Sequence, residues 1–81
     1  MQYVYILLSE KDPTKFYIGI TQDWQERLRE HNKQSAKGYT KRYAPWKLET
    51  YIAFDNMDLA TQFERYLKSG SGHGFLKKHL I

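Results

Sequence analysis

The chain has 81 residues, and its 13 basic and 9 acidic side chains give a net charge of +4 at neutral pH. This length predicts a single domain over residues 1–81, since chains below roughly 100 residues rarely divide into two cores. Cysteine is absent, which excludes disulfides, thiolate metal sites and a cysteine nucleophile. The first apolar run, residues 3–8, is too short for a signal peptide or a membrane span. We therefore expect a cytoplasmic protein with no membrane partner.

Three strands are predicted from apolar and alternating residues. Residues 3–8 and 16–20 are β-branched, aromatic and apolar, and the polar turn between them predicts a β-hairpin. Gly19 lies inside the second strand, where glycine often marks a bulge or a close approach to the backbone. Residues 47–54 alternate between apolar and polar side chains, which predicts a third strand.

Helices are predicted on both sides of the third strand. Thr21 or Asp23 opens the first helix, which is expected to end near Gln34, and residues 35–45 are expected to be a loop. A second helix begins within residues 55–58 and ends at the Ser-Gly run of residues 69–72. The sequence allows a short final helix near residues 74–80 but does not require it. The order β-β-α-β-α, with or without that helix, predicts an α+β domain.

Basic and aromatic residues are interleaved in the middle of the chain. Residues 31–48 contain five basic and three aromatic side chains and no acidic one, and no acidic residue follows Glu64. This mixture suits nucleic acid, because Lys and Arg neutralise phosphates while aromatic faces stack on bases. The alternative is an ordinary solvated loop. The candidate nucleic-acid contacts are Lys37, Tyr39, Lys41, Arg42 and Lys68.

Arg27 and His31 are predicted on the inward face of the first helix. At about 100° per residue they share the stripe of Trp24 and Leu28, whereas Glu30 points toward solvent. A charged group on a buried face needs a partner, because an unpaired buried charge is expensive. The alternatives are an arginine that reaches out to solvent and a core histidine satisfied by a neighbour.

Three further side chains have both an ordinary and a functional interpretation. Glu64 is expected at the rim of the second helix, where a glutamate is usually solvated. Tyr5 shares a strand face with Tyr3, and Tyr17 shares one with Gly19, so Tyr5 and Tyr17 are expected to meet across the hairpin if the register permits. Simple aromatic packing between strands is the alternative.

The spacing of these residues forms a pattern. Tyr3-Val4-Tyr5 is followed, eleven residues later, by Tyr17-Ile18-Gly19, and Arg27 lies eight residues beyond Gly19. His31 stands four residues after Arg27, and Glu64 falls on the second predicted helix. Over essentially the whole chain, this joint spacing resembles the GIY-YIG nuclease superfamily and its small stand-alone bacterial members. It is also similar to the nuclease domain of excision-repair subunits, which suggests a role in DNA repair.

The resemblance implies a three-stranded antiparallel sheet flanked by helices and a DNA endonuclease activity. It implies one Mg²⁺ or Mn²⁺ ion held by Glu64, with the two tyrosines and Arg27 around the scissile phosphate. A tyrosine, Tyr5 or Tyr17, would orient or deprotonate the attacking water with help from His31, whose ordinary pKa near 6.5 suits that role. Gly19 would allow a close approach to the backbone.

The sequence also departs from the family pattern. Tyr3 stands where the first signature has a glycine, Ile20 stands where some relatives carry lysine, and residues 69–78 contain no asparagine. Ser69, Ser71 or His73 could take the asparagine's place. A nucleic-acid-binding or adaptor domain without catalysis is therefore the first alternative. The second is a structural role, with the tyrosines in the core and a buried Arg27–Glu64 ion pair.

The expected substrate is DNA rather than RNA, cut according to its structure and with little sequence specificity. Binding is expected to be weak and sensitive to salt, because it depends mainly on phosphate contacts. A second copy of the chain or an unidentified protein partner is left open, since cutting both strands of a duplex is simplest with two active sites.

Overall fold

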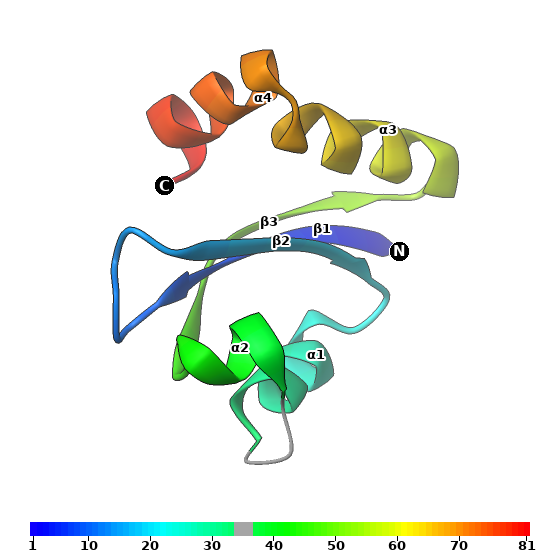
Figure 1. Cartoon of the computed structure of the whole chain (residues 1–81). Helices are drawn as coiled ribbons and strands as arrows, with labels where there is room; N and C mark the ends of the chain where they lie inside the picture. Colours follow the sequence, from blue (N-terminus) through cyan, green and yellow to red (C-terminus); the bar gives the residue numbers. More distant parts are fainter. Residues whose placement is uncertain (34–36) are drawn as a thin grey trace.

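The structure, a computed structural model, describes residues 1–33 and 37–81 and has one central sheet (Figure 1). Its strands lie in the order β2-β1-β3, and both neighbours pair antiparallel to the central strand. The strands are β1 (Gln2–Ser9), β2 (Phe16–Thr21) and β3 (Trp46–Phe54). This arrangement confirms the predicted hairpin and the predicted α+β class.

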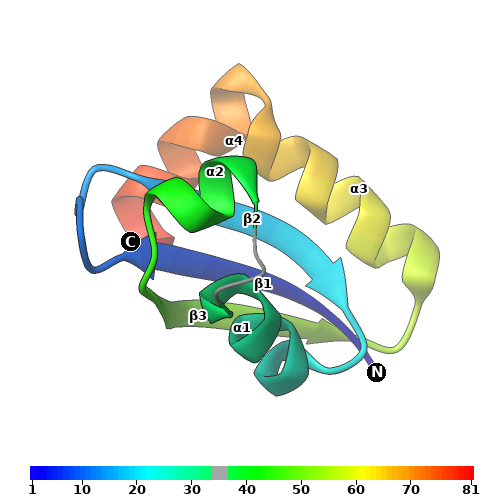
Figure 2. The same ribbon diagram turned by 60° about the horizontal axis from the view of Figure 1, so that its bottom comes forward.

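Helices cover both faces of the sheet (Figures 1 and 2). One face is covered by α1 (Trp24–Asn32) and α2 (Gly38–Arg42). The opposite face is covered by α3 (Met57–Lys68), α4 (Gly70–Phe75) and η1 (Leu76–Leu80), a short π-helical segment. Among the described residues, no helix has the length and apolar character needed to cross a bilayer.

The central strand β1 contributes side chains to both layers, because successive residues of a strand point to opposite faces. Val4 and Ile6 are fully buried in the core under α3 and α4, together with Leu67 and Leu76. This core is aliphatic at its centre and aromatic toward its margin.

The layer under α1 and α2 is built mainly from aromatic side chains. Tyr5, Leu7 and Trp46 are its buried members, and Tyr17 and Trp24 pack against them. The register places Tyr5 opposite Gly19 and Leu7 opposite Tyr17, so the two tyrosines lie diagonally across the hairpin. The predicted meeting of Tyr5 and Tyr17 is therefore confirmed.

Side-chain hydrogen bonds attach α1 and α2 to the start of β3. The Asn32 amide donates to the carbonyl oxygen of Trp46 (3.0 Å), and the Trp46 backbone N–H donates to Asn32 Oδ1 (2.6 Å). The Trp46 indole N–H donates to the carbonyl oxygen of Thr40 in α2 (2.8 Å). These bonds fix α1, and with it Arg27 and His31, relative to the sheet.

Short polar side chains determine where the two longer helices begin. Asp23 caps α1 by accepting a hydrogen bond from the backbone N–H of Glu26 (3.0 Å), and Asn56 caps α3 in the same way. Of the two predicted openings for α1, the structure therefore selects Asp23 over Thr21. The helix ends at Asn32, before the predicted end at Gln34, which lies outside the described residues.

One sequence prediction about a loop is wrong. The predicted loop at residues 35–45, of which 35 and 36 are outside the described residues, contains the helix α2.

The Ser-Gly run ends α3 as predicted. It also starts α4, because Ser69 Oγ accepts from the backbone N–H of Gly72 (3.2 Å). Gly72 is buried so closely against α3 that a Cβ atom there would overlap the carbonyl group of Tyr66. The predicted final helix at 74–80 corresponds to the end of α4 and η1.

Candidate active site

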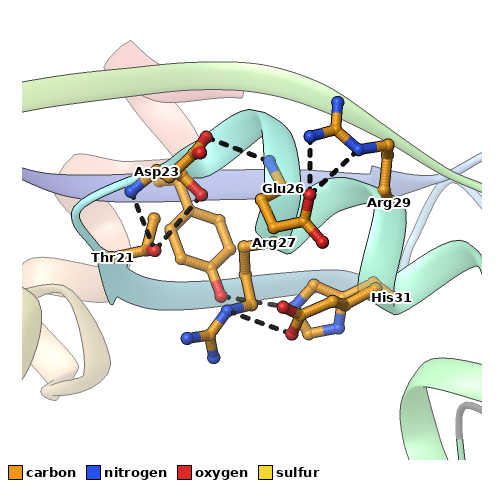
Figure 3. A network of polar contacts seen from close by, with 8 residues as sticks. Thr21, Asp23, Glu26, Arg27, Arg29 and His31 are labelled. Atoms are coloured by element: carbon orange, nitrogen blue, oxygen red, sulfur yellow. Dashed lines mark hydrogen bonds and ion pairs between the residues drawn. The ribbon is translucent and has the colours of Figure 1, made fainter.

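The centre of the candidate site is a buried contact between Tyr5 on β1 and His31 on α1. Tyr5 Oη and His31 Nε2 share a hydrogen bond of 3.2 Å, whose direction depends on the histidine tautomer. The residues are 1% and 8% exposed, respectively. The predicted inward position of His31 is thus confirmed, and its partner is a tyrosine of the first signature (Figure 3).

Burial keeps both members of this pair uncharged at neutral pH. Burial raises the pKa of the Tyr5 phenol well above its usual range; the neighbouring Tyr17 adds to this effect and the positive charge of Arg27 opposes it. Burial also lowers the pKa of His31, and Arg27 lowers it further while Glu30 opposes the shift. At pH 7 Tyr5 is therefore a protonated phenol and His31 a neutral imidazole.

Tyr17 on the edge strand β2 is the more accessible of the two phenols. Its ring centroid lies 4.6 Å from that of His31 and 6.2 Å from that of Tyr5. The Trp46 ring, 6.4 Å away, supports Tyr17 from the side of β3. Tyr17 is half-buried, whereas Tyr5 is enclosed, so a substrate at this face would meet Tyr17 first.

Gly19 is required by the position of the Tyr5 ring. The ring lies across the backbone of Gly19, its partner in the sheet, and a Cβ atom at position 19 would lie 2.6 Å from Tyr5 Cζ. Any larger residue would displace the ring and with it the hydrogen bond to His31. The expected close approach at Gly19 is confirmed, and the approaching group is the ring of the first signature's tyrosine.

Arg27 departs from its predicted position. Its side chain is 44% exposed rather than packed on the sheet, and its Nε lies 3.6 Å from Glu30 Oε2 (Figure 3). The physical reason is the length of arginine, whose aliphatic stem can leave a helix face and carry the guanidinium into solvent. Glu30 points to solvent as predicted, but it also holds Arg27, a role that its i,i+3 spacing could have indicated.

A surface cavity of about 360 Å³ opens beside Arg27, at the beginning of α1. The residues that line it come from the end of β2 and the first turns of α1. They are Thr21, Gln22, Asp23, Glu26, Arg27 and Glu30. The guanidinium borders this open space, and the other charged residues that line it are Asp23, Glu26 and Glu30.

Glu64 approaches the site from α3, on the other side of the sheet. Its side chain is only 20% exposed, less than expected for a solvated rim glutamate, and its Oε2 lies 3.3 Å from Lys68 Nζ. Its negative charge makes a small contribution to the raised pKa of Tyr5. Among the described residues, Arg27 pairs with Glu30 and Glu64 with Lys68, which contradicts the buried Arg27–Glu64 pair of the structural alternative.

The candidate nucleic-acid contacts fall into two groups. Tyr39, Lys41 and Arg42 lie on α2 with Lys37 just before it, on the same face as the tyrosines, and all four are exposed. The Tyr39 hydroxyl donates to the carbonyl oxygen of Phe16 (2.9 Å), which connects α2 to the edge strand β2. Lys68 lies instead on α3 beside Glu64.

The carboxylates available do not form a cage for a dehydrated metal ion. In the described part of the chain, no three His, Asp or Glu side chains gather closely enough to hold a metal. A single carboxylate such as Glu64 does fit Mg²⁺ or Mn²⁺ bound in hydrated form, because Mg²⁺ keeps several waters and completes its shell with phosphate oxygens. The donor set therefore fits one hydrated ion.

Of the residues considered as substitutes for the missing asparagine, Ser69 caps α4 and His73 packs against Phe16, with ring centroids 5.6 Å apart.

Comparisons with known proteins agree with this fold. A family model described as the GIY-YIG catalytic domain matches residues 1–78. The chain belongs to the GIY-YIG family of nuclease catalytic domains. The solution NMR structure of a UPF0213 protein from Bacillus halodurans has the same fold, with a TM-score of 0.55 and 31% identity, covering 96% of this chain and 84% of that one.

Curated relatives fall into two size classes. The UPF0213 protein of Haloquadratum walsbyi is 33% identical over 83% of this chain and 75% of its own length. The structure-specific endonuclease subunit SLX1 of Debaryomyces hansenii is 34% identical over 95% of this chain. The matched region is only 23% of that SLX1 protein, so the chain spans about a quarter of the SLX1 relatives that it matches.

Proposed function

We propose that this chain is a divalent-metal-dependent endonuclease domain that hydrolyses phosphodiester bonds in DNA. The observation that carries the proposal is the grouping of Tyr17, the Tyr5–His31 pair and Arg27 on one side of the sheet. Membership of the GIY-YIG family supports the reaction class.

Arg27 is the phosphate-binding group in this proposal. Its guanidinium is half-exposed beside an open cavity and makes only a long contact to Glu30, which a phosphate can replace. Two parallel N–H groups of the planar fork match two oxygens of a phosphate. Charge that develops on the phosphate is therefore stabilised by a group that is already in place.

The proposed roles of the two tyrosines differ because their environments differ. Tyr17 is accessible and orients the attacking water through its hydroxyl, whereas Tyr5 is enclosed and holds the His31 ring in place. Burial keeps His31 neutral, so the imidazole next to Tyr17 is in the protonation state that can accept a proton. Burial keeps Tyr5 protonated, so Tyr5 is a positioning residue rather than the base.

Glu64 is the proposed ligand of the divalent ion. When bound, such an ion supplies Lewis-acid stabilisation of the phosphate oxygens and lowers the pKa of its bound water. Lys68 neutralises the Glu64 carboxylate in the present structure and would have to leave it when the carboxylate binds a cation.

The proposed substrate is branched or flapped DNA in a repair process. Support comes from the SLX1 relatives, which are named as structure-specific endonuclease subunits. Because these relatives are named as subunits, we also propose a protein partner for this chain. A second copy of the chain is the alternative. The candidate contacts on α2 are mainly basic side chains, which favour phosphate contacts over base readout.

The test is cleavage of labelled single-stranded, duplex, flapped and branched DNA in Mg²⁺, Mn²⁺ or chelator. Glu64→Gln and Arg27→Ala are each expected to reduce metal-dependent cleavage by about 10²-fold or more. Glu49→Gln, a matched control at an exposed position of β3, is expected to cut like the wild type. Unchanged cleavage in both site variants would contradict the proposal, and binding without any cleavage would favour a non-catalytic adaptor.

A further inference from the structure

A group of cations that shares Arg42 with the α2 contacts lies at the end of the sheet where β1 turns into β2. We propose that Lys11, Lys15, Arg42 and Lys77, here called the hairpin-end cluster, bind the phosphate backbone of the DNA strand at a distance from the reacting phosphate. This inference rests on the proposed function and adds a substrate-anchoring surface to it.

Three parts of the chain contribute to the cluster. From the hairpin turn, Lys11 Nζ donates to the carbonyl oxygen of Arg42 (3.3 Å), at the end of α2. Lys15 Nζ lies 5.5 Å from the centre of the Tyr43 ring, and Arg42 Cζ lies 5.3 Å from the centre of the same ring. The hairpin turn and α2 therefore present their positive charges around one tyrosine.

The third part approaches from the opposite face of the sheet. Lys77 Nζ of η1 lies 5.0 Å from the centre of the Phe16 ring, and the carbonyl of Phe16 accepts the hydrogen bond from Tyr39. Phe16 thus connects both helical layers at the end of β2. Both ribbon views place the hairpin turn beside α2 and the C-terminal segment (Figures 1 and 2).

The cluster's charges are not neutralised within the structure. Ion pairs among the described residues are made by Arg27, Arg29 and Lys68, and none involves a member of the cluster. Two acidic residues, Glu10 and Asp12, share the hairpin turn, and Asp12 Oδ1 accepts hydrogen bonds from the backbone and hydroxyl of Thr14 (3.0 and 2.7 Å). The Asp12 carboxylate keeps its charge and attracts Lys15, so the four cations and these two carboxylates together carry 4 − 2 = +2. Aromatic faces hold two lysines and an arginine in place while leaving their N–H groups able to bind an anion.

The position of the cluster along β2 determines what it would contact. Phe16 begins the strand, at the end away from α1 and Arg27, and Tyr17 is the next residue. The cluster would therefore hold phosphates beyond Tyr17 on the side away from Arg27, outside the phosphate that is cut. Such contacts position the strand without reading its sequence.

The first experiment measures binding of a fluorescent branched DNA in chelator, over a series of salt concentrations. The test variant Lys11→Gln/Lys15→Gln/Lys77→Gln is compared with a control, Arg29→Gln/Arg65→Gln/Lys78→Gln, which changes exposed cations outside the cluster and outside the basic stretch of residues 31–48. Each variant loses three charges, so both have a net charge of +4 − 3 = +1. A variant with arginine at positions 11, 15 and 77 tests rescue, and thermal melting confirms that each variant is folded.

For the test variant, we expect the slope of log affinity against log salt to fall in magnitude by about 2 to 3. Its affinity at low salt should fall about tenfold or more, while the control keeps the wild-type slope and the arginine variant restores it. A single methylphosphonate, which removes one phosphate charge, is then placed at each position around the cut. At one or more positions away from the cut it should weaken wild-type binding, and at those positions it should have no effect on the test variant.

An unchanged slope in the test variant, or an equal loss in the control, would overturn the inference. Binding of phosphatidylglycerol vesicles that is lost in the test variant, with DNA binding unchanged, would also overturn it and assign the surface to membranes. A failure of the proposed function alone gives a different result: the wild-type protein binds DNA through the cluster but does not cut it. Wild-type protein that neither binds nor cuts DNA would contradict both.

Discussion

The two faces of β1 differ in chemistry although they alternate along the same eight residues. Val4 and Ile6 face α3 and α4, where the buried centre is aliphatic. Tyr5 and Leu7 face α1, where the packing is aromatic and includes the imidazole of His31. One face therefore supplies mainly apolar burial, and the other combines burial with groups that can move protons or bind phosphate.

The comparison teaches that the functional face is also well packed. Within the described residues, every buried side-chain nitrogen and oxygen has a hydrogen-bond partner. The polar groups of the functional face are thus satisfied before substrate arrives, and catalysis would use the accessible margin formed by Tyr17 and Arg27. If this division is correct, substitutions on the two faces should separate loss of stability from loss of activity.

The largest expected effect on stability comes from the aliphatic face. Ile6→Ala removes a fully buried side chain and should reduce the free energy of unfolding by about 2–5 kcal/mol. Cleavage per folded molecule should stay at the wild-type level, because Ile6 faces away from Tyr5. Denaturant unfolding and a cleavage assay below the melting temperature measure both quantities, and a specific loss of cleavage would show that the faces are coupled.

Gly19→Ala should affect both stability and activity. The new methyl group would collide with the Tyr5 ring, at an expected cost of about 1–3 kcal/mol. Displacement of Tyr5 would also misplace His31, for which we expect about a 10²-fold loss of cleavage. Gly74→Ala is the matched control, since a Cβ atom there meets nothing within 4 Å. If Gly19→Ala has the same stability and activity as Gly74→Ala, the Tyr5 ring does not require glycine at position 19.

The buried histidine predicts a loss of stability in mild acid. Because the pKa of His31 is lowered in the folded state, the unfolded chain binds a proton below about pH 6.5 that the folded chain does not. The free energy of unfolding should therefore fall as the pH falls from about 6.5 toward the lowered pKa, by at most about 1.4 kcal/mol per pH unit for this one proton. Denaturant unfolding at several pH values should show a shallower fall for His31→Gln. An identical pH dependence in that variant would indicate that another group is responsible.

The smallest expected effect comes from Glu30→Gln on the solvent side of α1. The Arg27–Glu30 pair is exposed and long, so stability should change by less than about 0.5 kcal/mol. Loss of the negative charge, which opposes the lowering of the His31 pKa, should lower that pKa further. An NMR titration of the His31 ring detects this shift, and Glu26→Gln, whose carboxylate pairs with Arg29, is the control. A His31 pKa that rises in Glu30→Gln would refute the assigned electrostatics.

Patterns of several residues made the strands and the long helices predictable. The apolar run of β1, the alternation in β3 and the polar helix starts at Asp23 and within residues 55–58 are local signals, and the structure uses them as expected. The meeting of Tyr5 and Tyr17 was predictable given a suitable register. The helix α2 was not predictable, because its five residues, which begin with Gly38 at a positive φ of 63°, are too few to show a helical period.

The site was only partly predictable from single residues. Helical geometry located His31 correctly, because an imidazole stays close to its own backbone, but it misplaced the long side chain of Arg27. Glu64 had no distinguishing local signal, since its low exposure depends on how α3 packs beside β2. Only the joint spacing shared with the GIY-YIG family indicated it.

The alternation of β1 has a consequence for changes in chain length. A one-residue insertion or deletion inside β1 would exchange its two faces, because the side-chain period of a strand is two. Tyr5 would then point into the aliphatic layer and Ile6 toward His31, so one length change would remove both the core and the site. In the turn between residues 10 and 15, by contrast, added residues would move only Lys11 and Lys15. Among GIY-YIG proteins that keep the signature tyrosines, we therefore expect variation in length to concentrate in this turn. Such variation should alter the affinity for DNA rather than the catalytic step.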